Sequence, residues 1–122
     1  MTYLAVSLGA ILGANARYLL GGWLTDRLGS SFPWSTLIIN VSGSLVIGLV
    51  LGIAADRVTP SWWRTGLAIG FLGSYTTFST FSYETVSLLR EGGFWTAALN
   101  IGGSVTASVA ATVIGLVVAQ LA

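Results

Sequence analysis

The sequence predicts an all-α membrane protein with four transmembrane helices, the third of which is broken near its centre. Three observations lead to this prediction. Hydrophobic residues make up 54% of the 122 residues and charged residues only 7%, whereas an ordinary soluble domain carries about 25% charged residues. The few charges gather mainly in three short connections between long apolar runs. A segment rich in hydroxyl groups, "GFLGSYTTFSTFSYE" at residues 70–84, interrupts the third run.

The length allows four helices of about 20 to 25 residues, each able to cross a hydrocarbon core about 30 Å thick. Little chain remains for a soluble domain, so we predict a single transmembrane domain over residues 1–122. The expected spans are residues 2–24, 33–55, 62–89 and 94–121. Charges mark the connections between them: Asp26 and Arg27, then Asp56, Arg57 and Arg64, then Arg90 and Glu91. The apolar amino terminus favours a first span over a signal peptide.

Composition excludes several functional classes. The sequence has no lysine, histidine or cysteine, which rules out disulfides, the usual zinc ligands and histidine general bases. A net charge of +1 gives no basic excess of the kind that binds nucleic acid. We therefore expect the lipid bilayer as the surroundings, no nucleic-acid partner and no organic cofactor.

The basic residues are balanced across the membrane. With four spans, Arg57 and Arg64 lie on the side of both termini, and Arg27 and Arg90 lie on the other. Because an excess of basic residues in cytoplasmic loops normally sets orientation, this balance predicts dual topology. Two copies in opposite orientations would form an antiparallel homodimer with the inverted symmetry of many transporters. One fixed orientation is the alternative, since Arg17 tips the balance if it counts toward the first connection.

Small residues recur every four positions in two spans. Gly9 and Gly13 share one face of the first span, and Ser44, Gly48 and Gly52 share one face of the second. Such faces let helix backbones approach closely in a membrane. We interpret both faces as packing surfaces.

Polar residues also enter the first two spans. Arg17 lies about two turns before the end of the first span, a depth that requires a partner, a wet cavity or a route to the interface. It either reaches the interface or makes an anion entrance electropositive. Asn40 shares a face with Thr36 and Ser44 and has two amide hydrogens to donate. It either bonds to another helix or serves a binding site.

The last two spans carry more extended polar patterns. Asn100, Ser104, Ser108 and Thr112 recur every four residues and form a stripe about 18 Å long at roughly 1.5 Å rise per residue. These side chains either bond to their own helix backbone or line a path. In the third span, polar residues follow two glycines, and a break there would expose carbonyls able to bind a cation and amides that favour an anion. Phe78 and Phe81 share a face beyond it, a spacing usually found in cores.

Together these residues resemble the Fluc fluoride channels, also called the CrcB family. The resemblance rests on "GANARY" in the first span, Asn40 followed by "VSGS" in the second, and "GFLGSYTTFSTFSYE" in the third. It covers the whole chain and implies an antiparallel, dual-topology homodimer in the inner (plasma) membrane. It further implies two pores that export fluoride passively and a structural sodium ion at the dimer centre.

The resemblance also implies roles for individual residues. The fluoride pore would be lined by Thr36, Asn40, Phe78, Thr80, Phe81, Asn100, Ser104 and Ser108. Arg17 and Glu84 would lie at a vestibule, and the backbone carbonyls of Gly73 and Thr76 from both subunits would hold the sodium ion. Two positions depart from the family pattern: Ser74 replaces a common second glycine, and Asn100 stands where some relatives have tyrosine.

Two rival functions stay open on the sequence alone. A small multidrug-type, proton-coupled transporter has the same size but needs a carboxylate in its first span, where this chain has Arg17. A noncatalytic membrane assembly protein would use the small and hydroxyl residues only for packing. An enzyme is not expected, because Asp26, Asp56 and Glu91 lie in connections and no nucleophile or acid–base constellation is present.

Overall fold

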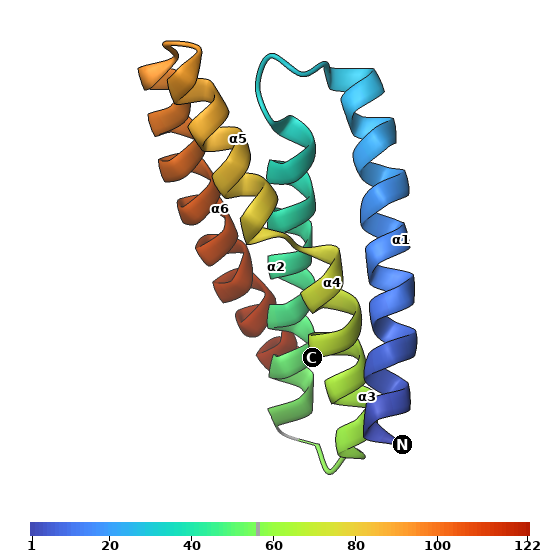
Figure 1. The fold of residues 1–122 in the computed structure, drawn as a ribbon. Coiled ribbons are helices and arrows are strands. Elements are labelled where there is room, and N and C mark those ends of the chain that lie inside the picture. The colour runs from blue at the N-terminus through green and yellow to red at the C-terminus, as the bar shows by residue number, and fades with distance from the viewer. Residues whose placement is uncertain (56) are drawn as a thin grey trace.

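The computed structural model describes residues 1–55 and 57–122, and these residues fold into helices joined by short connections. The helices run side by side in one bundle, with both termini toward the same end (Figure 1). Within the described residues, three helices are long and apolar enough to cross a membrane: α1 (Thr2–Leu28), α2 (Trp34–Ala55) and α6 (Phe94–Leu121). The all-helical prediction is confirmed, and three of the four predicted spans coincide closely with these helices. Asp56, assigned to the second connection, lies outside the described residues.

Helix α1 ends later than predicted, at Leu28 instead of residue 24, and so includes Asp26 and Arg27. A cation in the last turn interacts favourably with the helix dipole, and the Arg27 guanidinium lies 5.3 Å from the centre of the Trp23 ring. Gly29 caps the carboxyl terminus of the helix with a φ of 80°, which glycine adopts without steric strain.

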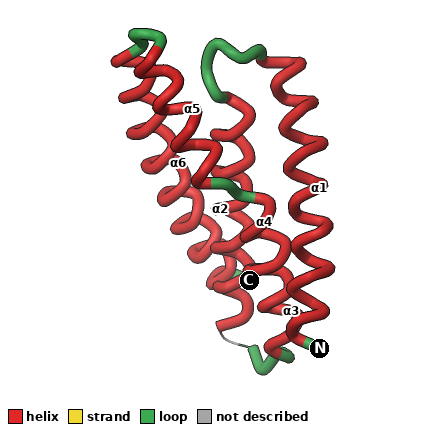
Figure 2. The backbone as a smooth tube through the Cα atoms, in the orientation of Figure 1, coloured by secondary structure: helices red, strands yellow, loops and turns green. Residues whose placement is uncertain are grey.

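The third span consists of four helical pieces, and its predicted break is confirmed. The span begins with α3 (Ser61–Thr65), a π-helical stretch η1 (Gly66–Leu72) and one turn, α4 (Gly73–Tyr75). The backbone is extended at Thr76 and Thr77, and α5 (Phe78–Arg90) follows. Figure 2 shows this extended link as a loop between two helical segments. The first half of the span packs against α1, whereas α5 packs against α6 (Figure 1).

The small-residue face of the first span packs against η1. A Cβ atom added at Gly9 or Gly13 would overlap backbone atoms of η1, including those of Phe71. From the other side, a Cβ at Gly70 would lie 2.6 Å from the Val6 carbonyl oxygen. The packing role predicted for this face is confirmed, because only glycine lets the two backbones come so close.

The second small-residue face packs against α6. A Cβ at Gly48 would overlap the backbone of Thr112, and one at Gly52 would lie 2.6 Å from the Cβ of Ala119. The Thr112 hydroxyl donates to the Ser44 carbonyl at 3.2 Å. Thr112, the last member of the polar stripe, therefore helps to join α2 to α6.

The helix break packs directly over α2. A Cβ at Gly43 would overlap the Thr76 methyl group and would lie 3.2 Å from the Tyr75 ring. The Ser42 and Tyr75 hydroxyls are 3.0 Å apart and share a hydrogen bond. Ser74 lies in the α4 turn with a negative φ, so serine replaces a glycine here without backbone strain.

Candidate functional site

Asn40 holds the extended link of the third span in place. Its side-chain amide donates to the Thr77 carbonyl at 3.0 Å, and its Oδ1 accepts the Thr77 N–H at 2.8 Å. Both backbone polar groups of Thr77 are thus paired with one side chain at the point where the helix is interrupted. Asn40 therefore bonds to another helical segment, as the packing interpretation expects. Its second amide hydrogen remains for another acceptor.

Thr77 begins the second half of the span. Its Oγ1 accepts the Thr80 N–H at 3.2 Å and so caps the amino terminus of α5. The same hydroxyl donates to the Thr80 Oγ1 at 3.1 Å. The free amides at the start of a helix carry partial positive charge, and Phe78 is the first residue of α5.

A cavity of about 420 Å³ opens beside the break, between α2, α5 and α6. Its lining includes residues of the break, Thr76 and Thr77, and two serines of the polar stripe, Ser104 and Ser108. Seven of the residues assigned by sequence lie here: Asn40, Gly73, Thr76, Phe78, Phe81, Ser104 and Ser108. The structure therefore brings together most of the predicted pore and the two predicted sodium ligands.

The two phenylalanines of this cavity differ in exposure. Phe81 is buried, whereas Phe78 is 77% exposed, and their ring centres are 5.6 Å apart. The two ring planes are tilted by 44° relative to each other. Aromatic ring edges carry partial positive charge, so this pair can face an anion. The exposed face of Phe78 leaves the cavity open on one side in the single chain.

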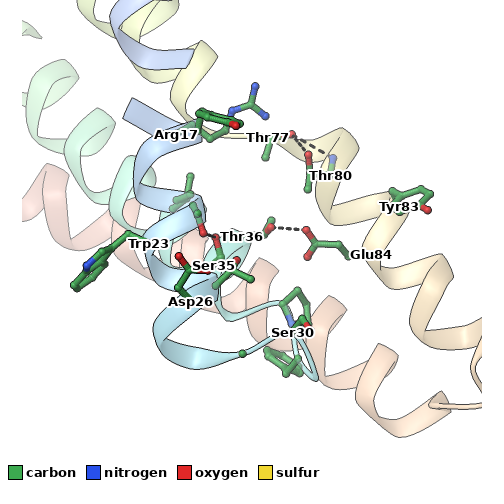
Figure 3. Close-up of a pocket in the computed structure, with 18 of the residues that line it drawn as sticks. Arg17, Trp23, Asp26, Ser30, Ser35, Thr36, Thr77, Thr80, Tyr83 and Glu84 are labelled. Atoms are coloured by element: carbon green, nitrogen blue, oxygen red, sulfur yellow. Dashed lines mark hydrogen bonds between the residues drawn. The ribbon is translucent and has the colours of Figure 1, made fainter. Parts of the chain in front are cut away.

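A larger cavity of about 1040 Å³ lies on the other side of the break, between α1, α2 and α5. It contains the remaining predicted residues except Asn100: Arg17, Thr36, Thr80 and Glu84. Figure 3 shows Thr36 and Glu84 pointing toward one another across this space. Thr77 lines both cavities, so the cap of α5 separates the wider space from the narrower one.

Glu84 is tied to the second span by one hydrogen bond. The Thr36 hydroxyl donates to its Oε1 at 2.6 Å (Figure 3). Its other oxygen, Oε2, is buried and has no hydrogen-bond partner among the residues that the structure describes. An unsatisfied buried acceptor is destabilising, and this oxygen is available for a further donor.

Asn100 lies in neither cavity. It is only 2% exposed, and its amide donates to the Thr85 hydroxyl at 2.9 Å while its Oδ1 accepts from Ser104 at 3.2 Å. In this chain Asn100 therefore stands behind the cavity wall, not in the lining where the resemblance had placed it. Ser104 connects it to the cavity.

The carbonyls at the end of α4 have lost their helical partners. The Thr77 N–H would bond to the Gly73 carbonyl in a continuous helix, but here it donates to Asn40. Gly73 itself is exposed, and the nearest atom to an added Cβ is the Ala68 carbonyl oxygen at 3.8 Å. Helix-terminal carbonyls are hard oxygen donors suited to an alkali cation.

Sequence reasoning missed four residues of this site: Gly43, Tyr75, Thr77 and Thr85. Thr77 stood within the recognised polar segment, and its place immediately before α5 is a signal for an N-cap. Gly43 stood within the quoted "VSGS" segment, but its contact with Thr76 depends on how the third span crosses the second. Thr85 gave no signal, because single threonines are common in membrane helices.

The bundle and its polar cavities define a small multi-pass helical membrane protein with a polar, hydroxyl-lined site at a helix break. A family model described as "CrcB-like protein, Camphor Resistance (CrcB)" matches residues 4–116. The chain belongs to this family.

Two curated relatives cover the chain almost completely, and both are named fluoride-specific ion channel FluC. The protein of Solibacter usitatus is 47% identical over 121 residues, which cover 98% of this chain and 99% of that protein. The protein of Geobacter metallireducens is 46% identical over 121 residues, which cover 98% of each chain. The sequence-based family assignment is confirmed.

Proposed function

We propose that this protein is a fluoride-selective passive channel of the inner (plasma) membrane, assembled as an antiparallel homodimer with two pores. The observation that carries the proposal is the smaller cavity, which the Phe78 and Phe81 rings line together with Asn40. Relatives of nearly equal length named as fluoride-specific channels support the choice of ion.

The smaller cavity offers fluoride weak, positively polarised contacts. The ring edges of Phe78 and Phe81 provide such contacts, and the remaining amide hydrogen of Asn40 provides one stronger donor. The Ser108 hydroxyl lies in the same lining. Several weak sites in sequence suit a channel, since an ion must bind well enough to enter and weakly enough to leave.

The larger cavity would serve as the vestibule. Arg17 lines it and brings a permanent positive charge, and such a charge raises the local concentration of anions. Thr80 and the Thr36–Glu84 pair lie in the same lining. Fluoride would pass from this vestibule to the smaller cavity at Thr77, where both linings meet.

A second copy would close the open side of the smaller cavity. Phe78 is 77% exposed there, and the exposed Gly73 lies beside it in the lining. The described residues fit a sodium ion at the dimer centre, because the Gly73 carbonyl has lost its helical partner and Thr76 follows in extended backbone. A sodium ion bound by these carbonyls in both subunits would join them and offset the charge of nearby anions.

The direction of transport follows from the gradient. Hydrogen fluoride crosses membranes as a neutral acid and dissociates inside the cell, so fluoride accumulates in the cytoplasm. A passive channel then exports it without coupling. A proton-coupled multidrug transporter is a poorer fit, because the only carboxylate of α1 is the exposed Asp26 in its last turns.

The test is fluoride efflux from liposomes that contain the purified protein, measured with a fluoride electrode beside chloride efflux. We expect fluoride release without chloride release, and we expect Phe81→Ile to abolish it because the ring edge is lost. Phe94→Ile is the matched control, since Phe94 is exposed at the start of α6 and lies outside both cavities. Folded protein that releases no fluoride would overturn the proposal and favour a noncatalytic assembly protein.

A further inference from the structure

Four buried groups behind the smaller cavity form a continuous row of hydrogen bonds. Ser104 donates to the Asn100 Oδ1, the Asn100 amide donates to the Thr85 Oγ1, and Thr85 donates to the Phe81 carbonyl at 2.8 Å. All four residues are less than 10% exposed. We call this row the Asn100 chain. It begins and ends at residues of the cavity lining, Ser104 and Phe81.

The direction of every bond in the Asn100 chain is fixed by chemistry. Thr85 has one hydroxyl hydrogen, and the Phe81 carbonyl can only accept, so that hydrogen points to Phe81. The Thr85 oxygen can then only accept, and it must face the NH₂ group of Asn100. This turns the Asn100 oxygen toward Ser104, and Ser104 must donate to it.

The consequence for the cavity concerns Ser104. A serine hydroxyl has a single hydrogen, and this one points away from the cavity toward Asn100. Ser104 therefore presents oxygen lone pairs to the space where an anion would stand. In this arrangement Ser104 offers an anion in the cavity no hydrogen-bond donor, although it lies in the lining.

We propose that Asn100 is a positioning residue that keeps fluoride binding weak at the level of Ser104, because it takes the only hydrogen that Ser104 could donate. The inference rests on the proposed function and assigns a role to a residue that does not touch the ion. When the Asn100 oxygen is absent, the Ser104 hydroxyl is free to turn. A hydrogen bond to a charged acceptor is about twice as strong as a neutral one, so the freed hydroxyl turns to fluoride.

The test measures fluoride flux against fluoride concentration in liposomes and fluoride binding by calorimetry in detergent, both on the full-length protein. Asn100→Leu removes the acceptor at similar volume. We expect its half-saturating fluoride concentration to fall about tenfold, the effect of one added hydrogen bond to a charged group, and its maximal flux to fall because release slows. Thr85→Val removes the acceptor that fixes the amide orientation, so the Asn100 NH₂ group can turn toward Ser104 and its oxygen away from it. This variant should shift the concentration in the same direction by a smaller factor. Thr85→Ser keeps the hydroxyl and should match the original protein.

A double-mutant comparison separates this role from a purely structural one. In a Ser104→Ala background, Asn100→Leu and Thr85→Val should no longer lower the half-saturating concentration, since no hydroxyl remains to be freed. Lost stability without this dependence on Ser104 would overturn the inference, as would an unchanged half-saturating concentration in both single variants. If Asn100→Leu does not fold, Thr85→Val decides the question alone. Absence of both flux and binding in the original protein would instead overturn the proposed function, and the inference with it.

Discussion

At the scale of single residues, Asn40 solves the main problem of a broken helix in a membrane. Backbone polar groups that lose their helical partners have no water to bond in the hydrocarbon region. The amide of Asn40 has a donor and an acceptor at the right spacing to pair with the N–H and carbonyl of one residue, Thr77. An asparagine opposite the break is therefore structural as well as a candidate ligand.

Replacement of Asn40 should destabilise the fold. Asn40→Ala leaves the Thr77 N–H and carbonyl unpaired, and each unsatisfied buried group costs about 1–3 kcal/mol. With two such groups, we expect the unfolding free energy in detergent micelles to fall by about 2–6 kcal/mol. The control is Asn15→Ala, because Asn15 is exposed and bonds only to the Ile11 carbonyl of its own helix. Equal losses in the two variants would contradict the role assigned to Asn40.

At the scale of elements, glycine positions decide which helices touch. Gly9 and Gly13 receive the backbone of η1, and Gly48 receives that of α6. Few large apolar side chains are buried between the helices. The arrangement of the spans therefore depends on close backbone contact more than on a large hydrophobic core.

A pair of glycine substitutions in α1 tests this dependence. Gly13→Ala places a methyl group into the Phe71 backbone, whereas Gly22→Ala meets no atom within 4 Å. We expect Gly13→Ala to lower the thermal unfolding temperature. Gly22→Ala should leave it unchanged or raise it, since alanine is about 1 kcal/mol more favourable than glycine inside a helix. Similar temperatures for both variants would show that the α1–η1 contact tolerates separation.

Much of the element order could be predicted from the sequence, because charges and turns punctuate long apolar runs. The break was predictable too, since polar residues follow glycines in the middle of the third span. The π-helical form of η1 was not predictable, because the residues of η1 show no periodic pattern that distinguishes a π-helix from an α-helix.

The site could be predicted only in part. Spacing placed Asn100 and Ser104 on one face, but it did not show that this face turns toward α5 at Asn100 and toward the cavity at Ser104. The division between two cavities likewise depends on how the helices pair. The periodicity of a single helix does not show how helices pair. Thr36 and Asn40, for example, share a face of α2 and yet line different cavities.

At the scale of the whole molecule, balanced loop charges and an open cavity lead to the same expectation. An orientation that the basic residues do not decide supplies copies facing both ways. A cavity left open beside the exposed Phe78 needs another surface to close it. We therefore expect antiparallel pairs.

Dual topology can be tested by labelling single cysteines in intact cells with a membrane-impermeant thiol reagent. The chain has no cysteine, so Ser31→Cys and Val58→Cys report on opposite connections without a background. Both positions are exposed. Under dual topology about half of each variant should be labelled, because a weak basic bias sets no orientation. Complete labelling of one variant and none of the other would establish a single orientation and contradict the antiparallel pair.

The glycine contacts between α2 and α6 also affect how firmly the cavity keeps its width. Side chains that separate helices can change rotamer and let the gap widen or narrow. Where Gly48 contacts the Thr112 backbone, main-chain atoms set the distance between α2 and α6. A change of side-chain rotamer cannot alter that distance. The wall that carries Asn40 and Ser108 is thus mechanically stiff. Stiffness of this kind lets a cavity distinguish two halide ions by radius, because the larger ion cannot push the helices apart.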